Sequence, residues 1–168
     1  SELLPFIMTL MTKARWFYES KRDTDSTNKI WIAVYNLNFS EEQNQTVIKI
    51  MMDVANKINI ENMDSAIKIW KTVYDLNCSA EQNHRVVLTM MDVANKLTRE
   101  NINSSIKLWQ AVYSMNLPPD EEQRVILTMM DVANALSAED INAAIKIWSA
   151  VYGLNISSER NSIVIRTM

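Results

Sequence analysis

Tryptophan recurs at a constant interval of 39 residues along the middle of this chain, at Trp31, Trp70, Trp109 and Trp148. A tyrosine follows each of them four residues later. The string Met-Met-Asp-Val-Ala-Asn also repeats at this interval, at 51–56, 90–95 and 129–134. Self-similarity at a fixed period of this length indicates a repeat protein, in which each unit buries its apolar face by stacking on its neighbours.

Composition favours helices as the repeating elements. The 168 residues are 48% hydrophobic, and a single glycine and three prolines leave little material for the turns that sheets need. We therefore expect an all-α fold, a right-handed α-solenoid of antiparallel helix hairpins with a 39-residue period. Residues 1–168 then form one helical-repeat domain, with hairpins at 1–39, 40–78, 79–117 and 118–156 and a partial repeat at 157–168.

Capping signals predict where the first helix of each hairpin begins. Ser40-Glu41-Glu42-Gln43 and Ser79-Ala80-Glu81-Gln82 match the capping box, in which the serine oxygen and the glutamine side chain satisfy backbone amides reciprocally. The third copy has Pro118-Pro119 instead, with a proline at the tolerated first helical position.

The second helix of each hairpin is expected to begin at a polar N-cap and to end at an asparagine. Good N-cap residues stand at Asn59, Thr98 and Ser137. The asparagines that could end the helix in the left-handed conformation are Asn38, Asn77, Asn116 and Asn155.

The second-helix pattern Ala144-x-x-x-Trp148-x-x-Val151, with Asn155 after it, resembles the second helix of pentatricopeptide and tetratricopeptide repeats. Stretches such as Trp109 to Tyr152 are also similar to the C-terminal helical hairpins of steroid receptor RNA activator protein and of the outer COPII coat subunit. Both resemblances imply a helical scaffold that binds macromolecules, carried by residues that pack helices.

Little in the chain indicates catalysis. With one His, one Cys and one Gly, the sequence contains no glycine-rich phosphate loop, Cys/His zinc cluster or two-histidine metal motif. We therefore expect no enzyme and no cofactor. Apolar runs are too short to cross a bilayer, and a lone cysteine, Cys78, favours a cytoplasmic or nuclear protein. The net charge of −3 gives no overall attraction for nucleic acid.

The repeated polar residues are the next candidates for a site. The tryptophans and tyrosines lie within apolar faces, so we expect them to form the core, with the repeated Asp and Asn as partners for buried indole N–H groups. Each Asp and Asn pair shares one side of its helix and together they form a column: Asp53, Asn56, Asp92, Asn95, Asp131 and Asn134. This Asp/Asn column either grips an extended peptide or joins adjacent repeats.

A second column consists of lysines two residues before each tryptophan: Lys29, Lys68, Lys107 and Lys146. It could read RNA phosphates or an acidic peptide. The i, i+4 pairs Asp25/Lys29 and Asp64/Lys68 are equally typical of an ordinary solvated helix face.

The first helix of the chain carries apolar residues opposite its expected core stripe, at Leu3, Phe6, Leu10 and Phe17. On the 39-residue period, Phe6 corresponds to Gln45 and Phe17 to Asn56 in the next copy. An apolar outer face on a terminal repeat needs a cover, which is an upstream segment, a second copy of the chain or another protein.

These observations favour a noncatalytic protein-interaction scaffold that binds a partner helix or peptide, or a second copy of itself. The binding surface is the apolar N-terminal face or the Asp/Asn column. The alternative is a helical-repeat protein that binds RNA through the lysine column.

Overall fold

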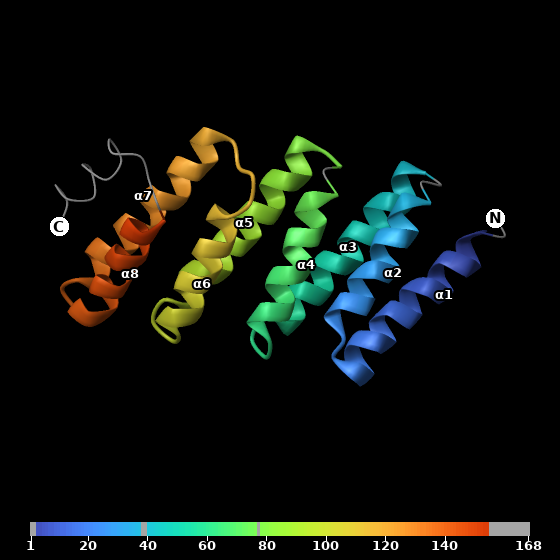
Figure 1. Cartoon of the computed structure of the whole chain (residues 1–168), viewed down its shortest axis with the longest axis horizontal. Coiled ribbons are helices and arrows are strands. Elements are labelled where there is room, and N and C mark those ends of the chain that lie inside the picture. The colour runs from blue at the N-terminus through green and yellow to red at the C-terminus, as the bar shows by residue number, and fades with distance from the viewer. Residues whose placement is uncertain (1–2, 38–39, 77, 155–168) are drawn as a thin grey trace. The chain divides into compact units, whose positions relative to one another are not determined.

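A computed structural model describes residues 3–37, 40–76 and 78–154, and these residues form eight α-helices and one π-helical turn with no strand among them (Figure 1). The expectation of an all-α fold is thus confirmed. The chain divides into two compact units, Ser1–Val86 and Val87–Met168.

Unit 1 contains two helix hairpins. In the first, α1 (Leu3–Trp16) runs into the π-helical turn η1 (Phe17–Lys21) and packs against α2 (Thr24–Asn36). In the second, α3 (Glu41–Ile58) packs against α4 (Met63–Asp75), and α2 touches both of them (Figure 1). The second helix of one hairpin therefore makes the contact with the hairpin that follows.

Unit 2 repeats this arrangement. Most of α5 (Ala80–Leu97) belongs to it, together with α6 (Ile102–Tyr113), α7 (Pro119–Leu136) and α8 (Ile141–Gly153). Helix α7 packs against α8, and α6 touches both.

The first helices begin where the capping signals predict. The Ser40 hydroxyl accepts a hydrogen bond from the Gln43 amide at 3.2 Å, and the Ser79 hydroxyl accepts one from the Gln82 amide at 3.1 Å. The reciprocal half of the box is not made in α3, because the buried Oε1 of Gln43 has no hydrogen-bond partner in the described part of the chain. Pro119 occupies the first position of α7, as expected.

The predicted starts of the second helices are wrong by three residues. The observed N-caps are Asp23, Asn62, Asn101 and Asp140, each of which accepts a hydrogen bond from the amide three residues ahead. Asn59 and Ser137 instead keep right-handed helical backbone at the ends of α3 and α7. Their amides still bond to the carbonyl oxygens of Ala55 and Ala133, so both residues close the last turn of the first helix instead of starting the second.

The prediction that α6 ends at an asparagine in the left-handed conformation is also wrong. Among the residues described, Arg22 is the one non-glycine residue with a positive φ, so Asn116 does not adopt that conformation. Helix α6 ends at Tyr113, with a right-handed C-cap at Ser114. Asn38, Asn77 and Asn155 lie outside the described residues.

The indole rings form the core. Trp31, Trp70 and Trp109 are fully buried, and Trp148 is half-buried. The expectation that the repeated Asp and Asn serve their N–H groups is wrong, because all four Nε1 atoms are buried without a hydrogen-bond partner among the residues described.

A hydrogen bond that recurs in two of the hairpins shows which positions of the first helices correspond. The Thr27 hydroxyl of α2 donates to the carbonyl oxygen of Ala14 in α1 at 3.2 Å, and the Ser105 hydroxyl of α6 donates to that of Ala94 in α5 at 2.8 Å. Thr27 and Ser105 each stand four residues after their N-cap. One fully buried alanine therefore marks the same position in each first helix, at Ala14, Ala55, Ala94 and Ala133.

Hairpin 1 carries two extra residues at its turn. The N-cap Asp23 stands nine positions after Ala14, whereas the N-cap Asn101 stands seven positions after Ala94. The π-helical turn Phe17–Lys21 and the left-handed Arg22 fill this stretch, and π-helical turns occur mostly as single-turn bulges in α-helices.

The predicted correspondences of the first helix are therefore wrong. With Ala14 aligned on Ala55, Phe6 corresponds to Val47 instead of Gln45, and Phe17 corresponds to Ile58 instead of Asn56. By the same alignment Leu10 corresponds to Met51.

Candidate interaction surfaces

A cavity of about 390 Å³ lies in unit 1 between the end of the first helix and α3. We call it groove 1. Its apolar part is formed by Tyr18, Ile50, Val54 and Ile58, and its charged rim by Arg15, Glu19, Arg22, Asp53, Lys57 and Glu61. The π-helical turn supplies Tyr18 and Glu19, so the irregular part of the first helix forms one wall of the groove. Such turns are frequent at functional sites.

Most rim charges of groove 1 are paired. Arg15 Nε lies 2.8 Å from Glu19 Oε1, and Arg22 Nη2 lies 3.5 Å from Glu61 Oε2. The hydrogen bond from Arg15 lowers the pKa of the Glu19 carboxyl against the opposing effect of desolvation, and the nearby positive charges of Arg15, Lys57 and Arg22 add to the lowering. The Arg22 guanidinium also lies over the Tyr18 ring, 5.4 Å from its centre.

Asp53 differs from these rim residues. Its exposed carboxylate makes no hydrogen bond or ion pair within the described part of the chain. It stands one turn from Lys57 on α3 and beside the apolar Val54.

Unit 2 has a smaller groove, of about 150 Å³, between α5 and α7. We call it groove 2. Its apolar residues are Val87, Leu88, Met91 and Val125, and its polar residues are Asp92, Asn95, Glu121, Arg124 and Thr128. Both grooves therefore lie between the first helices of successive hairpins, and a repeated Asp lines each one.

The structure divides the Asp/Asn column. Asp53, Asp92 and Asn95 line a groove, whereas Asn56, Asp131 and Asn134 are exposed and line neither. None of the six side chains makes a hydrogen bond or ion pair with the residues described, which goes against the hypothesis that the column joins neighbouring repeats.

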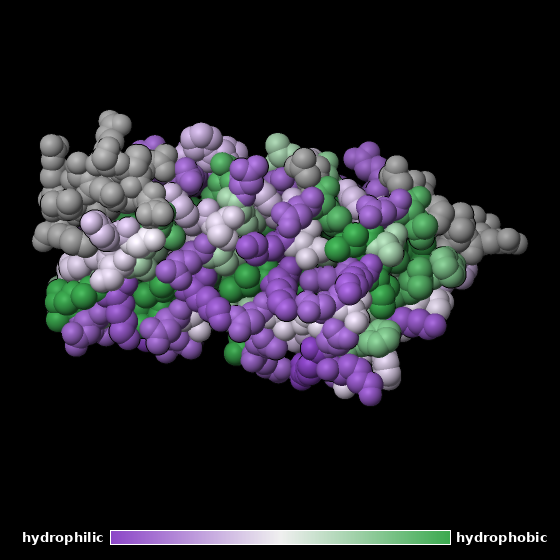
Figure 2. Space-filling model, viewed as in Figure 1, coloured by the Kyte–Doolittle hydropathy of each residue, from purple (hydrophilic) through white to green (hydrophobic). Residues whose placement is uncertain are grey.

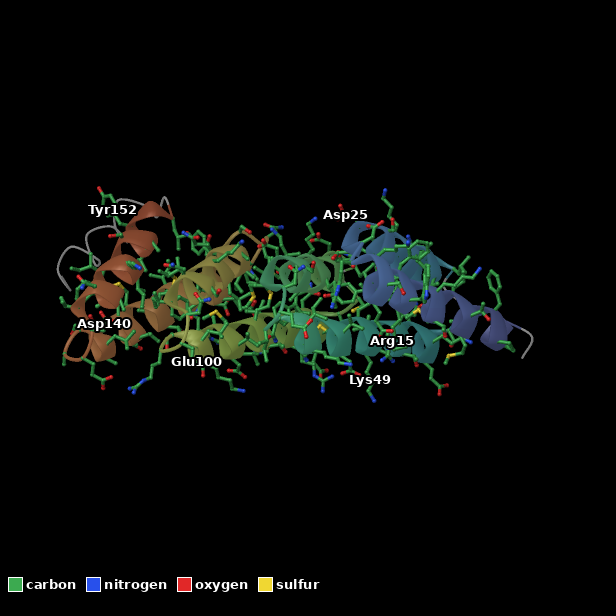
Figure 3. The ribbon with its side chains drawn as sticks, turned by 90° about the horizontal axis from the view of Figure 1, so that it is seen from below. Arg15, Asp25, Lys49, Glu100, Asp140 and Tyr152 are labelled. Carbon is green, nitrogen blue, oxygen red and sulfur yellow. The ribbon has the colours of Figure 1, made fainter. Side chains whose placement is uncertain are left out.

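The lysine column is exposed, at Lys29, Lys68, Lys107 and Lys146. Lys68 Nζ in α4 lies 3.0 Å from Asp25 Oδ1 in α2, so this lysine joins two hairpins of unit 1. Figure 3 shows Asp25 on the opposite side of unit 1 from Arg15 and Lys49, which belong to the first helices. Groove 1 and the Lys68–Asp25 pair thus occupy different faces of the unit.

The predicted apolar face of α1 is exposed in part. Phe6 is 53% exposed, and Leu10 and Phe17 are half-buried. The side chain of Leu3 lies outside the described part. Met8 and Trp16 are also about half exposed, and reasoning from the sequence missed them because the 39-residue alignment placed both in the core.

Helix α8 presents a second apolar face that the sequence interpretation missed. Ile141, Ile145 and Tyr152 are between 49% and 57% exposed, and the half-buried Trp148 lies between them. Their spacing of four, three and four residues puts all four on one side of the helix.

The described residues contain no cluster of three His, Cys, Asp or Glu side chains able to hold a metal ion. Cys78 is a half-buried free thiol next to Tyr35, and burial, with a smaller contribution from Cys78, raises the pKa of that phenol. None of the described helices has the length and apolar character needed to cross a membrane.

Comparison of the chain with protein-family models, with characterised proteins and with solved structures gives no match.

Proposed function

We propose that this protein is a noncatalytic scaffold of stacked helix hairpins, a right-handed α-solenoid, that binds an amphipathic helix of a partner protein. The observation that carries the proposal is an apolar groove in each unit, at a different level of the helices in the two units: Asp53 lies on the later first helix, α3, and Asp92 on the earlier one, α5. Each unit has a groove between successive first helices, with an apolar lining and an exposed aspartate of the repeated string, Asp53 or Asp92, at its edge.

The apolar lining supports a helix as the ligand. Ile50, Val54 and Ile58 follow one another at intervals of four residues and form a stripe along α3. A helix laid in such a groove places side chains at i, i+3, i+4 and i+7 against the stripe. Each fully buried aliphatic side chain contributes about 1.5–3 kcal/mol to such an interaction before the cost of association.

The charges at the rim of the grooves favour a ligand helix that carries a basic residue. Arg15 and Arg22 are already paired with carboxylates, whereas Asp53 and Asp92 have no such partner among the residues described. A lysine or arginine of the ligand would form a charge-assisted hydrogen bond with either aspartate. The proposed ligand is therefore a helix with one apolar face and basic residues beside it.

A pair of model peptides tests this proposal. One peptide is a helix of leucine and lysine with a leucine face, and the other has glutamate in place of every lysine. We expect the lysine peptide to bind more tightly by fluorescence anisotropy. We also expect Asp53→Asn with Asp92→Asn, or Val54→Glu, to weaken its binding about tenfold.

Asp131→Asn is the matched control, because Asp131 occupies the same place in the repeated string but lines neither groove. Equal binding of both peptides, or equal binding by the groove variants and the control, contradicts the proposal. The RNA alternative has less support, because Lys68 is engaged with Asp25. Tight, steeply salt-dependent binding of mixed single-stranded RNA would favour it. The single cysteine supports our expectation of a cytoplasmic or nuclear location.

A further inference from the structure

The outer face of α1 consists of positions that are buried in other first helices. Phe6 is 53% exposed, whereas the corresponding Val47 of α3 and Val125 of α7 are 2% and 1% exposed. Leu10 is half-buried, whereas the corresponding Met51 and Met129 are fully buried. Helices α3 and α7 each have a preceding second helix packed against them, α2 and α6 respectively. The face of α1 therefore has the character of a hairpin-to-hairpin contact surface.

The outer face of α8 is the other half of the same kind of contact. Ile141 and Ile145 are 50% and 49% exposed, whereas the corresponding Thr24 and Asn28 of α2 are 5% and 8% exposed. Tyr152 is the most exposed residue of this face, at 57%. Helix α2 packs against both α3 and α4, and the Thr24 hydroxyl donates to the Ser65 hydroxyl of α4 at 2.7 Å. Figure 2 shows apolar surface over α1 and, separately, beside α8.

We propose that two copies of this chain associate head to tail, with the α8 face of one copy packed on the first hairpin of the next, against the α1 face and the neighbouring α2. The contact would repeat the one that α2 makes with α3 and α4 inside unit 1. The occupant of each face is then a second copy, because the chain itself carries both halves of a contact that it already uses between its own hairpins.

Charge supports this orientation. Inside unit 1, Arg22 Nη2 lies 3.5 Å from Glu61 Oε2, and these residues occupy the same position in successive hairpins. The same position in the last hairpin is Glu139. The head-to-tail contact thus brings Glu139 of one copy toward Arg22 of the next, which are opposite charges. Glu139 also pairs with Arg99 of its own chain, at 3.2 Å, and would share its carboxylate between the two arginines.

A head-to-tail contact leaves one open face at each end of a dimer. Such heterologous contacts continue into chains or rings unless one face is blocked. The average mass in solution should therefore rise steadily with protein concentration instead of stopping at a dimer.

Complementary variants test the inference by sedimentation equilibrium of the full chain. Phe6→Glu blocks the α1 face, and Ile145→Glu blocks the α8 face. We expect each variant alone to be monomeric, with self-association weakened tenfold or more. We expect an equimolar mixture of the two to form a dimer and nothing larger, because each variant keeps the face that the other lacks.

Leu127→Glu is the control, since Leu127 is 48% exposed on α7 and belongs to neither face. It should associate like the unaltered chain. Circular dichroism shows whether each variant is folded, and the mixed dimer requires both variants to be folded. The groove variants of the proposed function should leave the mass unchanged, so the two proposals fail separately.

Two results would overturn the head-to-tail contact. The first is an unaltered chain that stays monomeric at every concentration. If Ile145→Glu then also lowers the stability of the chain, the α8 face is covered by residues 155–168 of the same chain instead of by a second copy. The second is continued self-association of either variant alone, which a symmetric contact between two α1 or two α8 faces would produce.

Discussion

The hydroxyl of Thr27 donates a hydrogen bond to the carbonyl oxygen of Ala14, and this bond holds α2 on α1 beside a turn that is two residues longer than its counterparts. The same hydroxyl lies 2.7 Å from the carbonyl oxygen of Asp23 in its own helix. Thr27 and Ala14 are both fully buried. A single side chain therefore joins the N-terminal turn of α2 to the preceding helix.

Replacement of Thr27 by valine should lower stability by about 1–2 kcal/mol, because the shape is kept while a buried donor is lost. Thr72→Val is the matched control, since within the described part of the chain the Thr72 hydroxyl bonds to the Lys68 carbonyl oxygen of its own helix, at 2.8 Å, and to no other helix. Urea unfolding followed by circular dichroism measures both changes. Equal losses in the two variants would show that the bond to Ala14 contributes nothing.

At position 22, replacement of Arg22 by glycine should leave the protein more stable than replacement by alanine. Its φ of 54° and ψ of 25° are left-handed, which costs a side-chain-bearing residue about 1–2 kcal/mol. Both replacements remove the same contacts with Glu61 and Tyr18, so their difference reports the backbone alone. We expect Arg22→Gly to melt at a higher temperature than Arg22→Ala.

The opposite order is expected at Lys29, an exposed position inside α2, where glycine should be less stable than alanine by about 1 kcal/mol. Thermal unfolding of the four variants measures both differences. If the alanine variant melted at the higher temperature at both positions, a left-handed backbone at Arg22 would be contradicted.

Acid should weaken the N-terminus of α2. Hydrogen bonds to Asp23 from the Ser26 hydroxyl, at 2.5 Å, and from the Ser26 amide, at 2.9 Å, lower the pKa of the carboxyl below its ordinary value of 3.8. Because the folded pKa is the lower one, this stabilisation is present above the unfolded pKa and is lost as the pH falls through the folded pKa.

Asp23→Asn should therefore keep its stability near neutral pH and lose less of it on acidification, since Asn62 and Asn101 already cap α4 and α6. Melting temperatures of the two proteins between pH 7 and pH 2 test this expectation. Parallel curves would show that Asp23 does not titrate with folding.

The two kinds of tryptophan should differ in their contribution to stability. Trp70 is fully buried, so Trp70→Ala should cost about 3–5 kcal/mol from lost packing. Trp148 is half-buried, and its replacement should cost less. Hydrogen exchange of the surrounding amides suits this comparison, because stacked repeats can unfold separately. A larger loss at Trp148 would contradict the burial described here.

Local signals in the sequence were sufficient for the helices and their core. The serine caps at Ser40 and Ser79 follow from hydrogen bonds between residues three positions apart. Apolar spacing that matches the turn of a helix is likewise a local property. The all-α fold could be predicted for this reason.

The second-helix boundaries could not be read in this way. Asn59 and Asn62 are equally good N-caps by residue type, and the cap is Asn62 because Asn59 is already the C-cap of α3. The choice depends on where the whole hairpin places its two helices, which no single residue encodes.

The sequence by itself determined which residues are apolar and how often they recur, because helical periodicity and capping act over a few residues. Only the tertiary structure decided that Ala14 pairs with Thr27 across the longer turn, and therefore that Phe6 stands at a position buried elsewhere. It alone placed Asp53 and Asp92 on grooves and left Ile145 exposed. The physical reason is that burial depends on which helix lies alongside, and that neighbour is distant in the sequence.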